Sequence, residues 1–177
     1  MQHCFMNYKT QLTDPDLYEI WDRIVDAGVA ESTFYGAQAT DHHSFRDLVR
    51  RPCNDVFMIA YDGTPVAIGW LNDRKERSAH LHFAFFHKPK WKRGEIPPHV
   101  QVGRYFVSRC VRDLPLDVLI GTTPVRAKSA CKYIQRVGAK PIGIIPHGAW
   151  FADTKQSEDA LLTAITREST EDQWTLY

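Results

Sequence analysis

The segment that decides the fold runs from Asp117 to Ala139 and reads DVLIGTTPVRAKSACKYIQRVGA. Its opening Val-Leu-Ile is a short apolar run that is typical of a buried strand. Pro124 marks a turn, and the residues from Ala127 onward form a helix. Gly138 is a typical helix end, because glycine adopts the left-handed backbone of a helix C-terminus without steric cost. The segment therefore predicts a strand, a turn, a helix and a glycine stop.

The first quarter of the chain predicts a strand followed by two helices. Cys4 to Lys9 fits a first strand. Asp14 as N-cap and Pro15 at the first helical position predict a helix start. A second helix is expected to begin at Asp41 and to end before Pro52, since proline disfavours helical backbone in the residue that precedes it.

The middle of the chain changes to strand periodicity. Val56–Tyr61 and Thr64–Leu71 flank Asp62-Gly63, a dipeptide that tolerates the positive φ angles of a tight hairpin turn. A third strand is expected from Ser78 to His87. Both of its faces carry apolar residues, which indicates a central strand.

The remaining elements complete an α/β fold. A basic loop, Lys88 to Gly94, precedes a helix that is expected to begin near Pro97 and to run to Asp113. After the deciding segment we expect a strand at Pro141–Ile145, a loop containing His147 to Asp153, and a last strand at about Leu161–Thr166. The order predicts a mixed, mainly antiparallel sheet of six or seven strands flanked by about four helices.

Composition indicates one globular domain that spans residues 1–177. The chain is 44% hydrophobic and 12% aromatic, with a formal net charge of +1, so no global charge favours nucleic acid or an anionic membrane. No apolar stretch approaches the roughly 20 residues of a membrane span, and we expect no signal peptide. The four cysteines are widely spaced, without metal or redox motifs. A reduced, cytoplasmic location is the expectation.

The deciding segment resembles the last strand–helix unit of the GCN5-related N-acetyltransferase (GNAT) superfamily. Ala130 and Gly138 match the alanine and the closing glycine of that helix, while Ala127, Ile134 and Ala139 replace its asparagine, tyrosine and phenylalanine. The order of elements along the chain also resembles the whole GNAT fold. The segments IGTTP and RVGAKPIGIIP and the terminal TRE are similar to segments of small GNAT-like proteins encoded by bacteriophages.

The resemblance implies an acyl-coenzyme A cosubstrate, either acetyl-coenzyme A or another acyl-coenzyme A. It would lie in a splayed gap beside the central strand. Backbone amides around Phe85, Phe86 and His87 would hold its thioester carbonyl, as preorganised N–H donors stabilise an oxyanion. The residues that would face its phosphates are Lys88, Lys92, Arg93 and Gly94.

The phosphate loop of this chain departs from the superfamily pattern. The usual Arg/Gln-x-x-Gly-x-Gly/Ala run is absent, and only Arg93-Gly94 and Gln101-Val-Gly103 resemble parts of it. The lysines of the loop are therefore expected to neutralise phosphates through their side chains. Two other interpretations stay open: a solvated basic loop, or a nucleic-acid contact made by Trp91 and its flanking lysines.

Two histidines and a tyrosine are the candidates for acid–base catalysis. His80 and His82 are two residues apart, so both leave the same face of the expected strand. His82 is the expected base, because an imidazole titrates near neutral pH, and packing against a helix is the alternative. Tyr133 is the candidate acid, since the superfamily position holds Ile134. A core tyrosine is its alternative.

The leading prediction for function is acyl transfer from acyl-coenzyme A to an unidentified amine. One alternative uses His80 and His82 as metal ligands, with His42 and His43, in a phage-type protein that modifies nucleic acid. Another is a non-catalytic binding or assembly module, because fold does not fix function. The leading prediction includes no resident metal and no membrane partner.

Overall fold

The computed structural model describes residues 4–87 and 96–174. Seven strands form one sheet in the order β1-β2-β3-β4-β5-β7-β6. Their bounds are β1 Cys4–Tyr8, β2 Asp55–Tyr61, β3 Thr64–Lys75, β4 Ser78–Phe85, β5 Val118–Pro124, β6 Lys140–Phe151 and β7 Gln156–Thr166. Neighbouring strands are antiparallel except β4 and β5, which are parallel. The expected mixed, mainly antiparallel α/β fold is confirmed.

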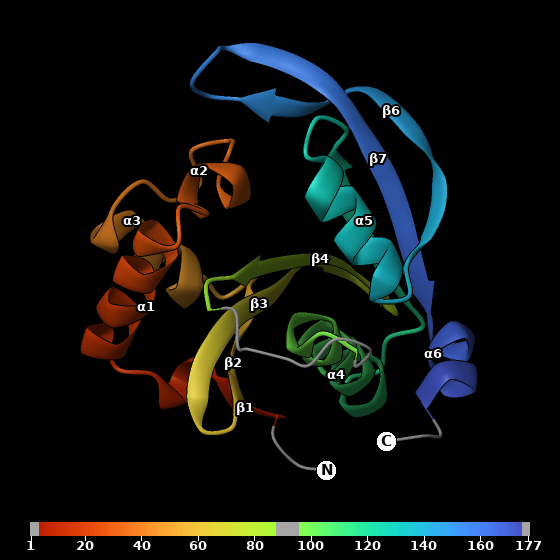
Figure 1. The fold of residues 1–177 in the computed structure, drawn as a ribbon, viewed down its shortest axis with the longest axis horizontal. Coiled ribbons are helices and arrows are strands. Elements are labelled where there is room, and N and C mark those ends of the chain that lie inside the picture. The colour runs from red at the N-terminus through yellow and green to blue at the C-terminus, as the bar shows by residue number, and fades with distance from the viewer. Residues whose placement is uncertain (1–3, 88–95, 175–177) are drawn as a thin grey trace.

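Helices cover both faces of the sheet (Figure 1). They are η1 Lys9–Gln11, α1 Asp14–Asp26, α2 Ala30–Thr33, α3 His42–Arg50, α4 Pro98–Asp113, α5 Lys128–Arg136 and α6 Arg167–Trp174. In the described ranges no helix is both long and apolar enough to span a bilayer. The short α2 and the terminal α6 were not expected from the sequence.

Two hydrophobic cores lie on opposite faces of the sheet. On one face, Leu17 of α1 and Phe45 of α3 pack with Ile68 and Trp70 of β3. On the other face, α4 packs on β2 to β5, and this core also includes Val137 from the end of α5 and Ile165 of β7. The alternation of side chains along β3 and β4 separates the two cores.

The expected turn and helix starts are confirmed with one shift. Asp62 and Gly63 have φ angles of 50° and 76°, as a two-residue hairpin turn requires. Asp41 caps α3 by accepting a hydrogen bond from the Ser44 amide at 2.8 Å. The cap of α1 is Thr13 instead of Asp14, because Thr13 and Asp16 exchange side-chain and backbone hydrogen bonds in a reciprocal capping arrangement.

Gly138 ends α5 as the sequence predicts. Its φ is 113°, and its amide bonds to the Gln135 carbonyl at 3.0 Å while the Ala139 amide bonds to Ile134 at 3.1 Å. This pair of bonds is the Schellman arrangement of helix C-termini. The deciding segment therefore folds as the strand β5, a turn, the helix α5 and a glycine stop.

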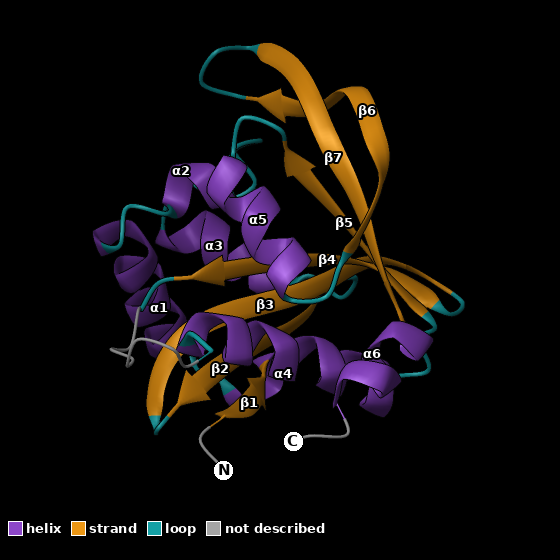
Figure 2. Ribbon diagram, turned by 45° about the vertical axis from the view of Figure 1, so that its right-hand side comes forward, coloured by secondary structure: helices purple, strands orange, loops and turns teal. Residues whose placement is uncertain are grey.

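The C-terminal hairpin differs from the expectation. Residues His147 to Phe151, expected in a loop, belong to the long strand β6, and β7 begins at Gln156. Two register shifts interrupt the pairing of β6 with β7, so the residue pattern does not alternate with period two. Figure 2 shows this hairpin extending beyond the other strands.

Candidate active site

The two parallel strands at the centre of the sheet pair over a short distance and then diverge. Their ladder consists of Ser78 with Val118, Ala79 with Leu119 and His80 with Ile120. Beyond these pairs β4 continues along β3, while β5 continues along β7. From Leu81 onward, β4 therefore has a ladder partner on only one side within the described residues.

The backbone amides of β4 alternate between its two edges. The amides of Phe86 and His87 both donate to the Val66 carbonyl, at 3.0 and 3.1 Å. Because successive amides of an antiparallel strand face opposite sides, those of Phe83 and Phe85 face the divergence from β5. The expectation that Phe86 and His87 offer amides to a thioester is thus corrected, since both amides are already engaged by β3.

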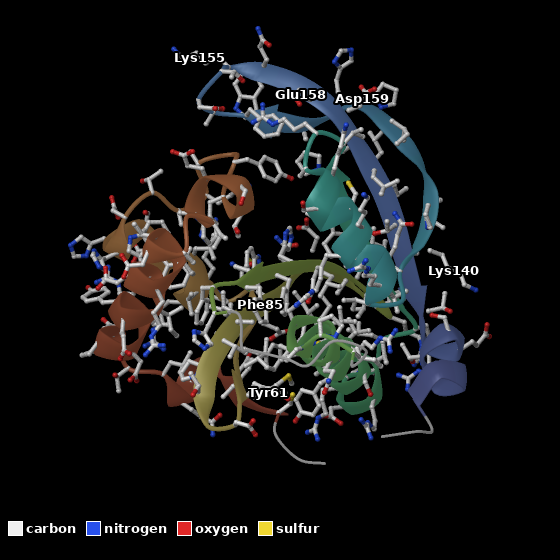
Figure 3. The ribbon with its side chains drawn as sticks, in the orientation of Figure 1. Tyr61, Phe85, Lys140, Lys155, Glu158 and Asp159 are labelled. Atoms are coloured by element: carbon white, nitrogen blue, oxygen red, sulfur yellow. The ribbon has the colours of Figure 1, made fainter. Side chains whose placement is uncertain are left out.

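An aromatic cluster lies on the α4 face of this divergence. The rings of Phe83 and Phe85 have centroids 6.2 Å apart, Phe85 packs against His99, and Phe83 packs against Tyr133. Figure 3 labels Phe85 near the end of β4, beside α4. The cluster joins β4, the first turn of α4 and the helix α5. It lies around the edge of β4 that carries the Phe83 and Phe85 amides (the amide edge).

Tyr133 projects from α5 toward α4. Its hydroxyl donates to the His99 carbonyl at 3.0 Å, and burial raises its pKa. A Cβ at Gly103 would lie 2.3 Å from the Tyr133 hydroxyl oxygen, so this glycine makes room for the tyrosine. Gly103 thus serves helix packing within α4 and not a phosphate loop. The neighbouring Ile134 is partly buried and packs against the same hydrophobic core as Tyr133.

The first turn of α4 offers few amides to an anion. Pro97 is its N-cap and Pro98 lacks an N–H, while the Val100 and Gln101 amides bond to the Pro97 carbonyl at 2.8 and 3.1 Å. The expected phosphate contacts Lys88, Lys92, Arg93 and Gly94 lie outside the described residues. An anion at this helix start would depend on side chains from that preceding loop.

On the opposite face of β4 the structure contains a pocket of about 230 Å³. It lies between β3, β4 and the segment from α2 to the end of α3. Its lining mixes apolar and aromatic side chains with an arginine, an aspartate, a histidine and several neutral polar side chains. The lining residues are Thr33, Tyr35, Gln38, Leu48, Arg51, Cys53, Asn54, Trp70, Asn72, Asp73 and His82.

His82 is held in this pocket by two contacts. Its ring stacks on Trp70 with centroids 5.0 Å apart and an interplanar angle of 8°, and Phe34 stacks on Trp70 in turn. Its Nε2 lies 3.0 Å from the Asn72 Oδ1. An amide oxygen only accepts, so Nε2 carries the proton and Nδ1 keeps its lone pair. Burial lowers the pKa of His82 to about 4, with a smaller contribution from His80. The ring is neutral at pH 7.

His80 shares the face of His82, because the two residues pair with Asn72 and Trp70 of one β3 face. His42 and His43 lie on α3, where His42 pairs with Asp22 at 2.7 Å and His43 approaches Tyr18. Across residues 4–87 and 96–174 no group of three or more histidine, cysteine or acidic side chains is gathered for a metal ion. The alternative of metal binding therefore gains no support from the described part of the chain.

One wall of the pocket is tied to the β6–β7 hairpin. Tyr35, which lines the pocket, accepts a hydrogen bond from the Ala152 amide at 2.9 Å, and its ring packs 5.0 Å from Phe151. The Arg126 guanidinium covers Phe151 at 3.3 Å and bonds to Glu158 at 2.8 Å. Figure 3 places Glu158 and Lys155 at the end of the hairpin that lies over α2. The hairpin thus braces the pocket wall.

The sequence singles out His82 as a candidate but does not indicate the residues that contact it in the structure. Asn72 and Trp70 meet His82 through the β3–β4 register, which the sequence does not specify because the connection contains a register shift between Asn72 and Lys75. Alternation along β3 was the signal that could have placed Trp70 and Asn72 on the same face as His82.

Comparisons with known proteins identify the fold. No family model matches the chain, and no curated protein matches it. Solved structures do match. AAC(6')-Ib in complex with ribostamycin and coenzyme A is 10% identical, with a TM-score of 0.73 over 98% of this chain and 99% of that one. A ribosomal protein α-N-acetyltransferase in complex with coenzyme A is 8% identical, with a TM-score of 0.72 over 96% and 97%.

A third match is a spermidine N-acetyltransferase from Vibrio cholerae in complex with coenzyme A and spermine. It is 12% identical, with a TM-score of 0.68 over 96% of this chain and 98% of that one. At such sequence identities a structural likeness establishes the fold, and the activity has to be argued from the residues of the site. The chain has the fold of the GNAT acetyltransferases.

Proposed function

We propose that this protein transfers an acyl group from acyl-coenzyme A to the amine of a small acceptor. The observation that carries the proposal is the amide edge of β4, which lies between two different environments. Its Phe83 and Phe85 amides face the divergence from β5, and the opposite side-chain face holds His82 in a pocket. Such an arrangement suits a reaction in which donor and acceptor meet across one strand.

The residues at the β4–β5 divergence fit an acyl-coenzyme A. Unpaired strand amides are donors that a bound molecule must satisfy, and the pantetheine arm of coenzyme A contains amide groups that pair with a strand edge. Lys88, Lys92 and Arg93 would hold the phosphates as side-chain cations. When bound, acyl-coenzyme A supplies a thioester carbonyl, which the amine attacks with loss of the thiolate.

His82 is the proposed base of the reaction. Its Nε2–H is committed to Asn72, so the Nδ1 lone pair is the proton acceptor. A pKa of about 4 makes it too weak to deprotonate a free ammonium group, so the acceptor first releases its ammonium proton to solvent and attacks as the neutral amine. The proton it accepts is the one that the amine nitrogen loses as the amide bond forms, when that N–H becomes far more acidic. His80 lies on the same face of β4 and contributes to the lowered pKa of His82, so it is a positioning residue.

Tyr133 is the proposed hydrogen-bond donor to the leaving sulfur, and its single O–H would exchange the His99 carbonyl for the sulfur when the thiolate forms. It lies beside Phe83 on the α4 face, and burial raises its pKa, so the hydroxyl keeps its proton at pH 7. An ordinary thiol, with a pKa of about 8.5, is a stronger acid than this phenol. Tyr133 therefore stabilises the thiolate by a hydrogen bond, and solvent supplies the proton that completes the thiol.

The solved relatives support an amine as acceptor. The Vibrio cholerae protein was solved in complex with coenzyme A and spermine, and AAC(6')-Ib in complex with ribostamycin and coenzyme A. These are the ligands of those proteins. Because the sequence identity to these proteins is low, the acceptor of this chain has to be inferred from the residues of its own pocket.

The first test of the proposal is acetyl-coenzyme A binding, measured by thermal unfolding and by calorimetry. Ligand at a hundredfold above its dissociation constant adds about 2.7 kcal/mol, which is roughly 5–10 °C in Tm for a domain of this size. Acetyl transfer to a panel of amines follows by thiol release. A protein whose Tm does not move with millimolar acetyl-coenzyme A contradicts the proposal and favours a non-catalytic module.

The second test separates the two residue roles. His82→Gln is expected to lower kcat by about 100-fold, within the usual range for a general base, while acetyl-coenzyme A binding is unchanged because the pocket lies on the opposite face of β4. Tyr133→Phe is expected to lower kcat without changing the acceptor KM. His43→Gln, on the exposed part of α3, is the matched control. Equal activity of His82→Gln and His43→Gln would remove His82 from the mechanism.

A further inference from the structure

The acceptor pocket contains two opposite charges that the proposed mechanism leaves unused. Arg51 and Asp73 are the two formally charged residues among those that line it. They come from separate elements, since Arg51 follows α3 and Asp73 lies in β3. The surroundings of each of these two side chains indicate which groups of a ligand they would bind.

Arg51 lies at the end of α3, in a turn that hydrogen bonds hold in place. The Asn54 amide donates to the Arg51 carbonyl at 3.1 Å, and Lys9 Nζ donates to the same carbonyl at 2.9 Å. The buried Asn54 side chain donates to the Leu48 carbonyl at 2.7 Å. The Arg51 guanidinium itself has no hydrogen bond or ion pair with any described residue, so its five donors are available to a ligand.

Asp73 is held next to the base in a constrained backbone. Its φ is 46°, a left-handed conformation that aspartate tolerates better than most residues. It directly follows Asn72, whose oxygen orients His82, and its negative charge acts on the His82 ring. The Asp73 carboxylate makes no hydrogen bond or ion pair within the described ranges. An ammonium group that approaches His82 therefore meets Asp73.

Resting on the proposed function, we infer that the acceptor is a small amphoteric amine whose anionic group binds Arg51 and whose amino group lies at Asp73 and His82. A guanidinium pairs with a carboxylate or a phosphate through two parallel hydrogen bonds. The pocket volume of about 230 Å³ is below the roughly 300–1,000 Å³ of sites for drug-sized ligands, so a molecule of amino-acid size fits. A polycation is disfavoured, because it would meet one carboxylate and an opposing guanidinium.

The test uses acceptors that differ in a single anionic group. The probes are the proteinogenic L-amino acids and phosphoethanolamine, compared with cadaverine, putrescine and spermidine. At least one amphoteric probe is expected to show a kcat/KM at least about tenfold above every simple amine, as charge-assisted hydrogen bonds contribute that much. Preference for amino acids over phosphoethanolamine identifies the anion as carboxylate, and the reverse identifies it as phosphate.

Variants of the two charges complete the test. Arg51→Gln is expected to raise the KM of the preferred probe at least about tenfold, whereas the KM of the simple amines is expected to stay the same or to fall. Arg51→Glu is expected to favour cadaverine. Asp73→Asn is expected to weaken all amines. Arg46→Gln, on α3 and outside the pocket lining, is the matched control. Equal effects of Arg51→Gln on lysine and cadaverine, or a wild-type preference for spermidine, would overturn the inference.

A binding measurement keeps this result separate from the proposed reaction. Each probe is titrated calorimetrically into the protein with and without coenzyme A. Arg51-dependent binding of an amphoteric probe without any acyl transfer would contradict the transferase and support the pocket assignment. Acyl transfer to simple amines with no contribution from Arg51 would support the transferase and contradict the pocket assignment. Failure of every probe to bind would also contradict the pocket assignment.

Discussion

The Tyr133 hydroxyl occupies the space that a side chain at position 103 would need. An added Cβ at Gly103 would lie 2.3 Å from that oxygen and 2.7 Å from a methyl group of Val137. The hydroxyl is fixed there by its bond to the His99 carbonyl. The approach of α5 to α4 therefore depends on a glycine in the middle of a helix, where glycine is otherwise unfavourable.

Gly103→Ala is expected to lower the free energy of unfolding by about 1–3 kcal/mol, the usual cost of overpacking a core. The variant Gly103→Ala with Tyr133→Phe removes the nearest clash and is expected to recover part of the loss. Chemical denaturation measures both. Gly143→Ala is the control, because nothing lies within 4 Å of a Cβ at that position. A Gly103→Ala protein as stable as the wild type contradicts the packing described.

The stability of the protein is expected to fall between pH 6.5 and pH 4. His82 has a pKa lowered to about 4 by burial, against about 6.5 in the unfolded chain. The unfolded state therefore binds a proton in this window that the folded state does not. The contribution of neutral His82 is complete above pH 6.5, and about 3 kcal/mol of it is lost as the pH falls to 4.

Denaturation at several pH values checks this slope in the wild type and in His82→Phe. Phenylalanine keeps an aromatic ring on Trp70 and has no titrating group, so the slope between pH 6.5 and 4 should decrease. His43→Phe retains the wild-type slope, because His82 remains. An unchanged slope in His82→Phe would mean that another group accounts for the pH dependence.

Asn72→Asp is expected to raise the pKa of His82. A carboxylate at the 3.0 Å position of the Asn72 oxygen stabilises the imidazolium, and such a neighbour shifts a pKa by roughly 1–3 units. NMR titration of the His82 ring measures the change directly. Asn7→Asp, at the β1 edge of the sheet, is the control. No upward shift would show that Asn72 does not face Nε2 in solution.

Phe151→Ala is expected to loosen the contact between the hairpin and the pocket wall. The Phe151 ring lies between Tyr35 and the Arg126 guanidinium, so its loss removes the packing around the Ala152–Tyr35 hydrogen bond. Hydrogen exchange at the Ala152 amide should become faster. Trp150→Ala is matched to it, since Trp150 is the adjacent residue of β6 and is exposed. Equal exchange rates in the two variants would contradict the bracing role.

Local chemistry made most of the fold predictable. The Asp62-Gly63 turn and the Gly138 helix end need particular backbone angles that few residues adopt, so their positions are visible in the sequence. The strand β6 was missed at His147 to Phe151 because it is an edge strand with prolines, glycines and two register shifts. Its strand conformation depends on pairing with β7, and the sequence of one strand does not specify that pairing.

Only those features of the candidate site that depend on a single strand could be predicted from the sequence. The spacing of His80 and His82 places both on one face, whatever the partner strand. The contact of His82 with Asn72 depends on the β3–β4 register, and the presence of Arg51 and Asp73 in one pocket depends on how α3 lies against the sheet. Such relationships arise between elements, so they follow from the assembled core and not from local patterns.

The short β4–β5 ladder also has a mechanical consequence. Among the described residues, three ladder pairs join the block formed by β1 to β4 to the block formed by β5 to β7, with the Arg77–Asp117 contact beside them. The helix α4 packs on residues of both blocks. Opening of the sheet along this line therefore requires α4 to detach and the contacts of Tyr35 with Phe151 and Ala152 to break, whereas each block retains its own antiparallel ladders. Under an applied force or in partial denaturant, the chain is expected to separate into these two unequal units at the strand pair where Ser78 meets Val118.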